Sequence, residues 1–170
     1  RAIRTCPCPV IACVEGGAAG AGAAIALACD MIFASKIAFL ASSYVKIGLT
    51  PDAGTTVFLN AAIPRWLAAE LLFTGDKIPA TRLYELGVVN HLAEEGRALE
   101  AAMAMATRLE AGPAGAIMRA KNLLSGATSN SFDEQLEAEA DNLAQALGGA
   151  EAKEGITAFI ERRPPTFREE

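Results

Sequence analysis

The sequence lacks an excess of positive charge, a zinc-binding cysteine pattern and a long apolar run. Its 170 residues include 15 Lys and Arg against 20 Asp and Glu, which gives a net charge of -5. A protein that binds the phosphate backbone needs an excess of cations on one face, so nucleic acid is not an expected partner. The four cysteines form no CxxC pair, and the one histidine, His91, is far from them in sequence. This arrangement predicts neither a metal site nor a disulfide framework, and a reducing, cytoplasmic compartment fits it best.

The most apolar stretch, residues 16–29, is bounded by Glu15 and Asp30. It is shorter than the roughly 20 residues that a membrane helix needs, and its Gly and Ala content favours close packing, so no membrane partner is expected. No signal peptide is recognised, because prolines follow Arg1 and Arg4 in place of an apolar segment. With 52% apolar and 21% charged residues, the chain is typical of a globular protein with a packed core.

The first part of the chain predicts short strands followed by short helices. The apolar run Val10–Val14 predicts a buried strand, Gly16–Gly22 a glycine-rich turn, and residues 23–28 a helix. Two more strands are expected at Met31–Ala34 and Ile37–Ala41. The further elements expected here are a loop at Gly48–Gly54, a helix at Thr55–Ile63, helices opened by Pro64 and by Pro79, and a strand at Val88–Leu92.

The second part of the chain has the apolar spacing of amphipathic helices. Leu99–Leu109 and Phe132–Leu147 place apolar residues at helical intervals, and a last helix is expected at Glu151–Arg163. Ser131 and Glu134 match a capping box at the start of the second of these helices. We therefore expect a mixed α/β core over residues 1–95 and a helical region over residues 96–170.

The glycine-rich turn Gly16–Gly22 allows three functional interpretations. A P-loop needs Lys-Ser/Thr where Ala23–Ala24 stands, and a dinucleotide fingerprint needs a small residue at the position of Ile25. In the third interpretation, backbone amides around Ala21 and Gly22 point at a developing negative charge and form half of an oxyanion hole. The structural alternative is that small residues only let the helix pack closely on its strand.

Six segments of the chain carry a recognisable pattern in a fixed order. They are Pro9–Gly22, Ala28–Asp30, Ile47–Thr55, Leu72–Ile78, Leu86–Asn90 and Glu154–Arg163. Together they resemble the enoyl-CoA hydratase/isomerase (crotonase) superfamily, and most closely its phenylacetate-pathway-type isomerases. The resemblance implies an α/β fold, a crotonase-like spiral of ββα units followed by a C-terminal helical trimerisation region, in a homotrimer or hexamer. It also implies an enzyme that binds an acyl-CoA thioester, with coenzyme A as part of the substrate and no separate cofactor.

In this family two backbone N–H groups hold the thioester oxygen as it becomes an enolate. By motif position Ala21 matches the second of these amides, and the resemblance places Gly20 and Gly22 beside the bound substrate. The first amide comes from an earlier segment of the family pattern, of which these 170 residues match only about the last two-thirds. The resemblance therefore assigns half of the oxyanion hole to this sequence.

The catalytic positions depart from the hydratase pattern. Hydratases of the family carry two glutamates, and the matching positions here are Ala24 and Tyr44. Water addition needs a base and an acid, and neither of these side chains replaces a carboxylate, so ordinary hydration is disfavoured. One carboxylate remains in the region, Asp52, in the turn Pro51–Gly54.

Asp52 matches an aspartate that relatives use in two ways. In Δ3,Δ2-enoyl-CoA isomerases it moves a proton between the α and γ carbons of the substrate, and in 4-chlorobenzoyl-CoA dehalogenase-like members it attacks an aromatic ring. A single carboxylate suffices for a 1,3-proton shift, because the same group removes and returns the proton. The resemblance therefore favours an isomerase with Asp52 as its catalytic base.

Other interpretations remain open for each of these residues. Asp52 is also placed to cap the helix at Thr55, and Tyr44 either lines the acyl pocket or packs in the core. Phe159 and Arg162 match positions that contact CoA in the family, but core packing and a favourable helix C-terminal cation explain them equally well. At the level of function, the alternatives are an impaired homologue that only binds CoA or assembles, and dehalogenase or thioesterase chemistry through Asp52.

Overall fold

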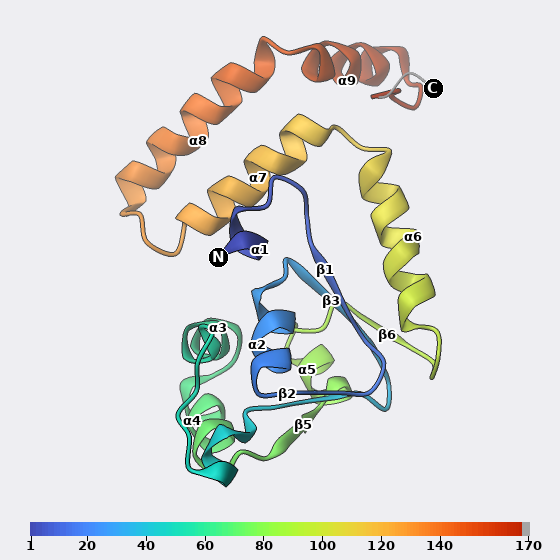
Figure 1. Cartoon of the computed structure of the whole chain (residues 1–170). Coiled ribbons are helices and arrows are strands. Elements are labelled where there is room, and N and C mark those ends of the chain that lie inside the picture. The colour runs from blue at the N-terminus through green and yellow to red at the C-terminus, as the bar shows by residue number, and fades with distance from the viewer. Residues whose placement is uncertain (168–170) are drawn as a thin grey trace. The chain divides into compact units, whose positions relative to one another are not determined.

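The computed structural model describes residues 1–167 and divides the chain into two compact units (Figure 1). We call residues Val10–Ala104 the sheet unit. The helical unit combines Arg1–Pro9 with Met105–Glu170. Helix α6 (Ala98–Glu110) contains the point at which the chain passes from the first unit into the second.

The first sheet of the sheet unit is parallel throughout. Its strands are β1 (Ile11–Val14), β3 (Met31–Ser35) and β6 (His91–Ala93), in the order β1-β3-β6. Their apolar, partly β-branched sequences suit strands that are covered on both faces. Asn90 Oδ1 accepts a hydrogen bond from the Ile32 backbone N–H at 2.8 Å, which ties the chain before β6 to the central strand.

The second sheet is mixed and consists of strands of three residues. β2 (Gly17–Ala19) pairs in parallel with β4 (Phe39–Ala41), which pairs antiparallel with β5 (Lys77–Pro79). The Phe39 ring covers Gly17, so that a Cβ atom at Gly17 would overlap it. This close approach explains why the sequence has glycine at that position.

Short helices enclose the apolar core of the sheet unit. Helix α2 packs on β1, β2 and α3, and α3 packs on α4 (Figure 1). Leu83 and Ala24 are fully buried. The helical elements are α2 (Ala21–Ala28), the 3-10 helix η1 (Ser43–Ile47), α3 (Thr55–Ala62), α4 (Arg65–Thr74) and α5 (Ala80–Glu85).

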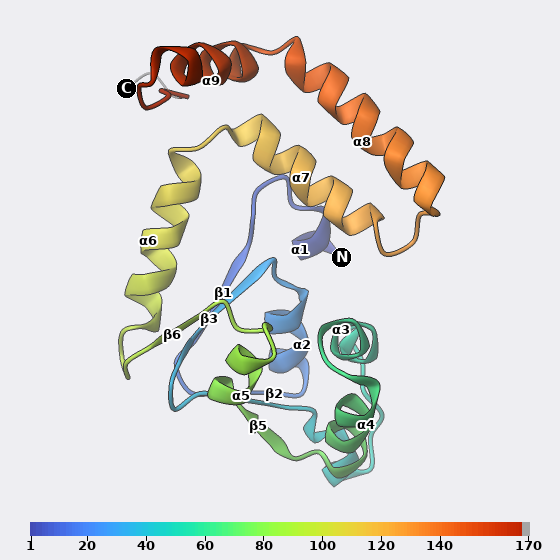
Figure 2. The same cartoon turned by 180° about the vertical axis from the view of Figure 1, so that it is seen from behind.

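The helical unit contains α1 (Ala2–Thr5), α7 (Ala114–Gly126), α8 (Phe132–Leu147) and α9 (Ala150–Glu161). Helices α7 and α8 lie side by side, as Figure 2 shows from behind. The buried Lys121 of α7 donates from Nζ to the backbone carbonyl of Cys8 at 2.9 Å. This contact attaches the N-terminal segment to α7.

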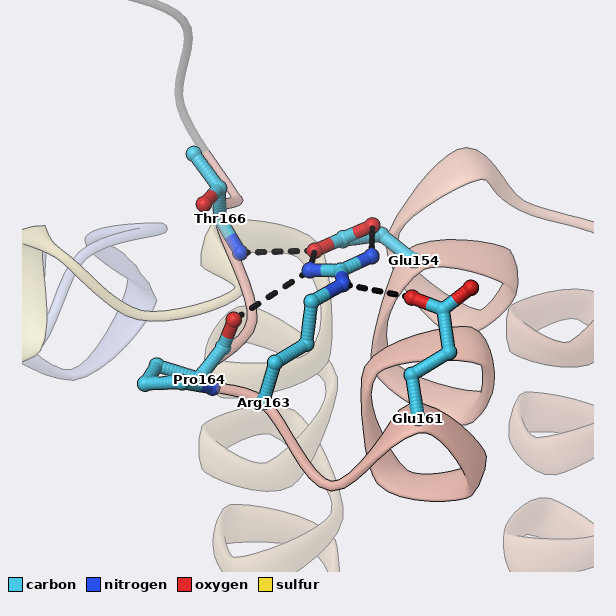
Figure 3. Close-up of polar contacts among 5 residues, drawn as sticks. All are labelled: Glu154, Glu161, Arg163, Pro164 and Thr166. Carbon is cyan, nitrogen blue, oxygen red and sulfur yellow. Dashed lines mark hydrogen bonds and ion pairs between the residues drawn. The ribbon is translucent and has the colours of Figure 1, made fainter.

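A polar network fixes the chain that follows α9 (Figure 3). The Arg163 guanidinium donates to both Glu154 oxygens at 2.6 and 2.9 Å, and to Glu161 at 2.7 Å. Glu154 also accepts the Thr166 backbone N–H at 2.8 Å. The Arg163 cation and these hydrogen bonds lower the pKa of Glu154 to about 2.

Most elements predicted from local patterns are present. Strands β1 and β4 lie within the predicted Val10–Val14 and Ile37–Ala41, β3 extends one residue beyond the predicted Met31–Ala34, and α3 and α8 occupy their predicted ranges to within one residue. The capping box of Ser131 and Glu134 is formed. Helices α4 and α5 begin one residue after their prolines, which take the N-cap position. Within residues 1–167, none of the helices is long and apolar enough to cross a membrane.

The prediction of a strand at Val88–Leu92 is wrong in its first half. The backbone N–H groups of Val88 and Val89 both donate to the Leu83 carbonyl, at 2.8 and 3.2 Å. The chain therefore turns back at the end of α5, and β6 begins only at His91.

Five further elements and one boundary differ from the sequence analysis. The glycine-rich segment contains strand β2, and α2 begins at Ala21, two residues earlier than predicted. The sequence pattern does not predict η1, β5 or α7. The compact units divide after Ala104, whereas the sequence pattern places a boundary near residue 95.

Candidate active site

The start of α2 presents backbone amides at the surface of the sheet unit. Gly20 is the N-cap, with φ 53° and ψ -125°, a conformation open to glycine and strained for other residues. Its N–H donates to the Ala41 carbonyl at 2.9 Å, which fixes the turn on β4. Ala21 and Gly22 follow, both exposed, in the first turn of α2. The N–H groups of a first turn have no acceptor within the helix, and the helix dipole adds positive potential there.

The loop that carries Asp52 is fixed through its backbone. The Asp52 carbonyl accepts both the backbone N–H of Thr55 at 2.9 Å and its hydroxyl at 2.8 Å. Thr55 is 1% exposed, so this anchor is buried. Between them, Ala53 and Gly54 have φ of 51° and 86°, which makes a tight left-handed turn. The exposed Asp52 side chain leaves this turn toward η1.

The interpretation of Asp52 as a helix cap is wrong. The N-cap of α3 is Gly54, and no side chain caps that helix. The Asp52 carboxylate instead accepts a hydrogen bond from the Tyr44 hydroxyl, through Oδ1. Because this acceptor stabilises the protonated phenol, the pKa of Tyr44 is raised, and partial burial adds to the effect.

Tyr44 also reaches the start of α2. A Cβ atom built on Gly20 would lie 3.7 Å from Tyr44 Cζ, an ordinary van der Waals distance. The ring of the half-buried Tyr44 therefore lies near Gly20, and its hydroxyl is hydrogen bonded to Asp52. The structure thus brings Gly20, Ala21, Tyr44 and Asp52 into one cluster, with Gly22 one residue further along α2.

The other residues singled out in the sequence, Ala24, Phe159 and Arg162, are not part of this cluster. Ala24 is fully buried in the core and presents no polar atom to this cluster. Phe159 and Arg162 belong to the helical unit, at the end of α9, where the Arg162 N–H donates to the Phe159 carbonyl at 3.3 Å. The Phe159 side chain is 84% exposed, which excludes its interpretation as a core residue within this chain. Their contact with CoA remains a prediction.

Sequence reasoning did not find the hydrogen bond between Tyr44 and Asp52 or the role of Thr55. Tyr44 lies in the short 3-10 helix η1 and Asp52 lies eight residues later in a loop, so no periodicity signals their contact. Within residues 1–167, there is no group of three His, Cys, Asp or Glu side chains that could hold a metal ion. The chemistry available at the cluster is therefore one carboxylate, one phenol and the amides of α2.

Comparison with known proteins places this chain in a family. Residues 1–170 match the family model described as Enoyl-CoA hydratase/isomerase. The chain is 35% identical over 167 residues to a Rhodobacter capsulatus protein named "Probable enoyl-CoA hydratase", and 32% identical over 167 residues to the "1,2-epoxyphenylacetyl-CoA isomerase" of Escherichia coli. These alignments cover 98% of this chain and 65% and 64% of the two relatives.

A solved structure extends the likeness to the fold. The crystal structure of an enoyl-CoA hydratase from Polaromonas matches with a TM-score of 0.96 and 45% identity, over 98% of this chain and 65% of that one. The chain thus spans slightly less than two-thirds of the length of these relatives. The expected crotonase-type α/β fold is confirmed. This chain belongs to the enoyl-CoA hydratase/isomerase family.

Proposed function

We propose that this chain is part of an acyl-CoA isomerase that moves a carbon–carbon double bond by a 1,3-proton transfer. The observation that carries the proposal is the hydrogen bond of Tyr44 to Asp52, together with the position of the Tyr44 ring near Gly20 at the start of α2. A base and an amide donor are the two groups that an enolate-forming reaction needs. No separate cofactor is required, since coenzyme A is part of the substrate.

Each step of the proposed reaction balances with these groups. Asp52 accepts a proton from C2 of a 3-enoyl thioester, and the electrons of that C–H bond form a dienolate whose charge lies on the thioester oxygen. The Ala21 N–H donates a hydrogen bond to this oxygen. Asp52 then returns the proton to C4, which leaves the conjugated 2-enoyl thioester. By resemblance, the second amide donor comes from an earlier segment of the family pattern.

Hydration is disfavoured by the residues at the two matching positions. Ala24 is fully buried and apolar, and the Tyr44 hydroxyl donates to Asp52. Water addition needs both a proton acceptor and a proton donor near the double bond. The relatives compared above include proteins named as hydratases and one named as an isomerase, so the choice rests on these side chains.

A second candidate is an acyl-CoA-binding protein without turnover. It is favoured by the same substitution of both hydratase glutamates, which leaves Asp52 as the only carboxylate of the cluster. The two candidates differ in one respect, because both bind acyl-CoA and only the isomerase converts it.

The test is conversion of a trans-3-enoyl-CoA, followed by the absorbance of the conjugated product. Asp52→Asn keeps the shape of the side chain and removes the base, so the rate should fall by about 10²–10⁴-fold. The matched control is Asp141→Asn, the same change at an exposed position of α8, which should leave the rate unchanged. Wild-type binding of the thioester without conversion would favour the second candidate.

The helical unit supports two further parts of the proposal. We assign Phe159 and Arg162 to CoA binding, because an exposed ring and a cation suit an adenine and its phosphates. We also assign the exposed apolar side chains of α8 and α9 to a homotrimer or hexamer interface. They are Phe132, Leu136, Leu143, Leu147, Ile156 and Ile160.

These two assignments have separate tests. Arg162→Ala should weaken binding of free CoA, measured by calorimetry, while Arg108→Ala on α6 should not. Leu143→Asp should reduce the mass measured by light scattering. A monomeric wild type would refute the interface.

A further inference from the structure

The proposed reaction uses Asp52 as its base and does not involve the Tyr44 hydroxyl that is hydrogen bonded to it. Proton removal requires a base, and Asp52 meets this requirement without a phenol. The Tyr44 hydroxyl nevertheless donates to Oδ1 of this carboxylate, while the ring of the same residue lies near Gly20, where an added Cβ atom would meet it at 3.7 Å. Tyr44 thus connects the loop of the base to the turn that presents the amides.

The surrounding structure fixes the backbone of Asp52 but not its side chain. The double hydrogen bond from the buried Thr55 ends at the main-chain carbonyl. The carboxylate itself is exposed, and an exposed side chain samples several rotamers. Within residues 1–167, the hydroxyl of Tyr44 is the one protein donor to this carboxylate.

We propose that Tyr44 is the positioning residue of this site, holding Oδ1 of Asp52 so that Oδ2 receives the substrate proton beside the α2 amides. The inference rests on the proposed function. The Tyr44 ring lies near Gly20, where an added Cβ atom would meet it at 3.7 Å, and Gly20 is itself fixed by the hydrogen bond from its N–H to the Ala41 carbonyl at 2.9 Å. The Tyr44 side chain therefore sets the position of the Asp52 carboxylate relative to the Ala21 N–H.

Tyr44 suits this role because it keeps its proton. The Asp52 acceptor raises the pKa of the phenol, so the hydroxyl donates throughout the neutral range. Of the two groups, Tyr44 is the hydrogen-bond donor and Asp52 is the proton acceptor.

The first experiment compares Tyr44→Phe with Tyr84→Phe in the isomerisation assay. Tyr44→Phe keeps the ring against Gly20 and deletes only the hydroxyl, whereas Tyr84 is a 50% exposed residue of α5. We expect kcat to fall about 10–100-fold in Tyr44→Phe with KM unchanged, because a misplaced base costs rate and not binding. Equal kcat values for the two variants overturn the inference, provided both unfold at the wild-type temperature.

The second experiment is independent of activity. The chain has two tyrosines, so in a Tyr84→Phe background the ultraviolet absorbance of phenolate reports Tyr44 alone. Adding Asp52→Asn removes the negative acceptor and should lower the pKa of Tyr44 toward its ordinary value of about 10. Adding the control Asp141→Asn should not move the titration.

The two experiments separate the inference from the function on which it rests. An active wild type whose Tyr44 titration ignores Asp52→Asn overturns the inference alone. Inactivity of a protein that also carries the earlier segment of the family pattern, with a titration that responds, overturns the proposed isomerase and with it the catalytic use of Tyr44, while the contact itself stands.

Discussion

The carboxylate of Glu15 lies at the N-terminus of α6, although more than 80 residues separate the two in sequence. Oε1 accepts the N–H groups of Ala98 at 2.7 Å and Leu99 at 3.4 Å, and Oε2 accepts that of Gly96 at 3.1 Å. Glu15 follows β1 directly, so its backbone position is set by the parallel sheet. We expect Glu15→Ala to destabilise the protein more than any ordinary surface substitution.

The magnitude follows from two contributions. A side-chain cap of a helix N-terminus contributes about 0.5–2 kcal/mol, and a negative charge beside the positive end of the dipole adds about 0.3–1 kcal/mol. Glu15→Ala removes both and should cost about 2 kcal/mol. Glu15→Gln keeps an acceptor oxygen and removes the charge, so it should cost about 1 kcal/mol.

Thermal unfolding measures the loss of stability of each variant relative to the wild type. For a chain of this length, about 2 kcal/mol corresponds to a decrease in Tm of roughly 4–8 °C. Glu137→Ala, at an exposed position inside α8, is the control for losing a glutamate away from a helix start. Amide hydrogen exchange adds a local measurement, since the N–H groups of Ala98 and Leu99 should exchange faster in Glu15→Ala.

The unfolding temperatures of these variants show whether the hydrogen bonds of Glu15, its charge, or neither stabilises α6. If Glu15→Ala and Glu137→Ala unfold at the same temperature, the three hydrogen bonds do not stabilise α6. If Glu15→Gln costs nothing, the charge contributes nothing and only the hydrogen bonds remain, whereas equal costs for Glu15→Gln and Glu15→Ala would assign the whole effect to the charge.

Two further predictions concern stability. The pKa of Glu154 is about 2 in the folded chain against an ordinary value of 4.5, so this contact stabilises the fold above pH 4.5 and its contribution is lost as the pH falls toward about 2. The unfolding temperature should therefore fall more steeply over this range in the wild type than in Glu154→Gln, and parallel curves would contradict the assignment. Gly17→Ala should cost about 1–3 kcal/mol in chemical denaturation because the new methyl group meets the Phe39 ring. Gly22→Ala, with nothing within 4 Å and a helical position, should be neutral or slightly stabilising, and the same cost for both variants would refute the packing argument.

The elements that the sequence predicts are those with a local physical signal. Helix α8 has a long amphipathic pattern and a capping box between Ser131 and Glu134, and both are visible within a few residues. Strand β2 has no such signal, because Gly17–Ala19 contains no large apolar side chain and forms a strand only by pairing with β4. Helix α7 buries Lys121, which an apolar pattern cannot anticipate.

In the candidate site too, the sequence identifies some residues, whereas only the structure shows the contacts between them. Asp52 and Ala21 were identifiable because family motifs surround them, and the resemblance transfers position by position. The hydrogen bond that joins Asp52 to Tyr44 depends on how η1 and the following loop lie in space, and no sequence period encodes that. The same holds for Thr55, whose buried hydroxyl holds the Asp52 carbonyl and which the sequence presents only as the first residue of a helix.

The identity of residue 44 determines how much chemistry Asp52 can perform alone. A carboxylate at this position would meet Asp52 with a like charge and would have to move away from it or take up a proton, giving the site two separate proton carriers. A phenol instead donates to Asp52, and its raised pKa keeps its proton from the substrate. Water addition requires one group to take a proton from water while another delivers one to carbon. With Tyr44 bound to Asp52, the cluster offers one carboxylate as proton acceptor, which under the proposed function suits a double-bond shift better than hydration.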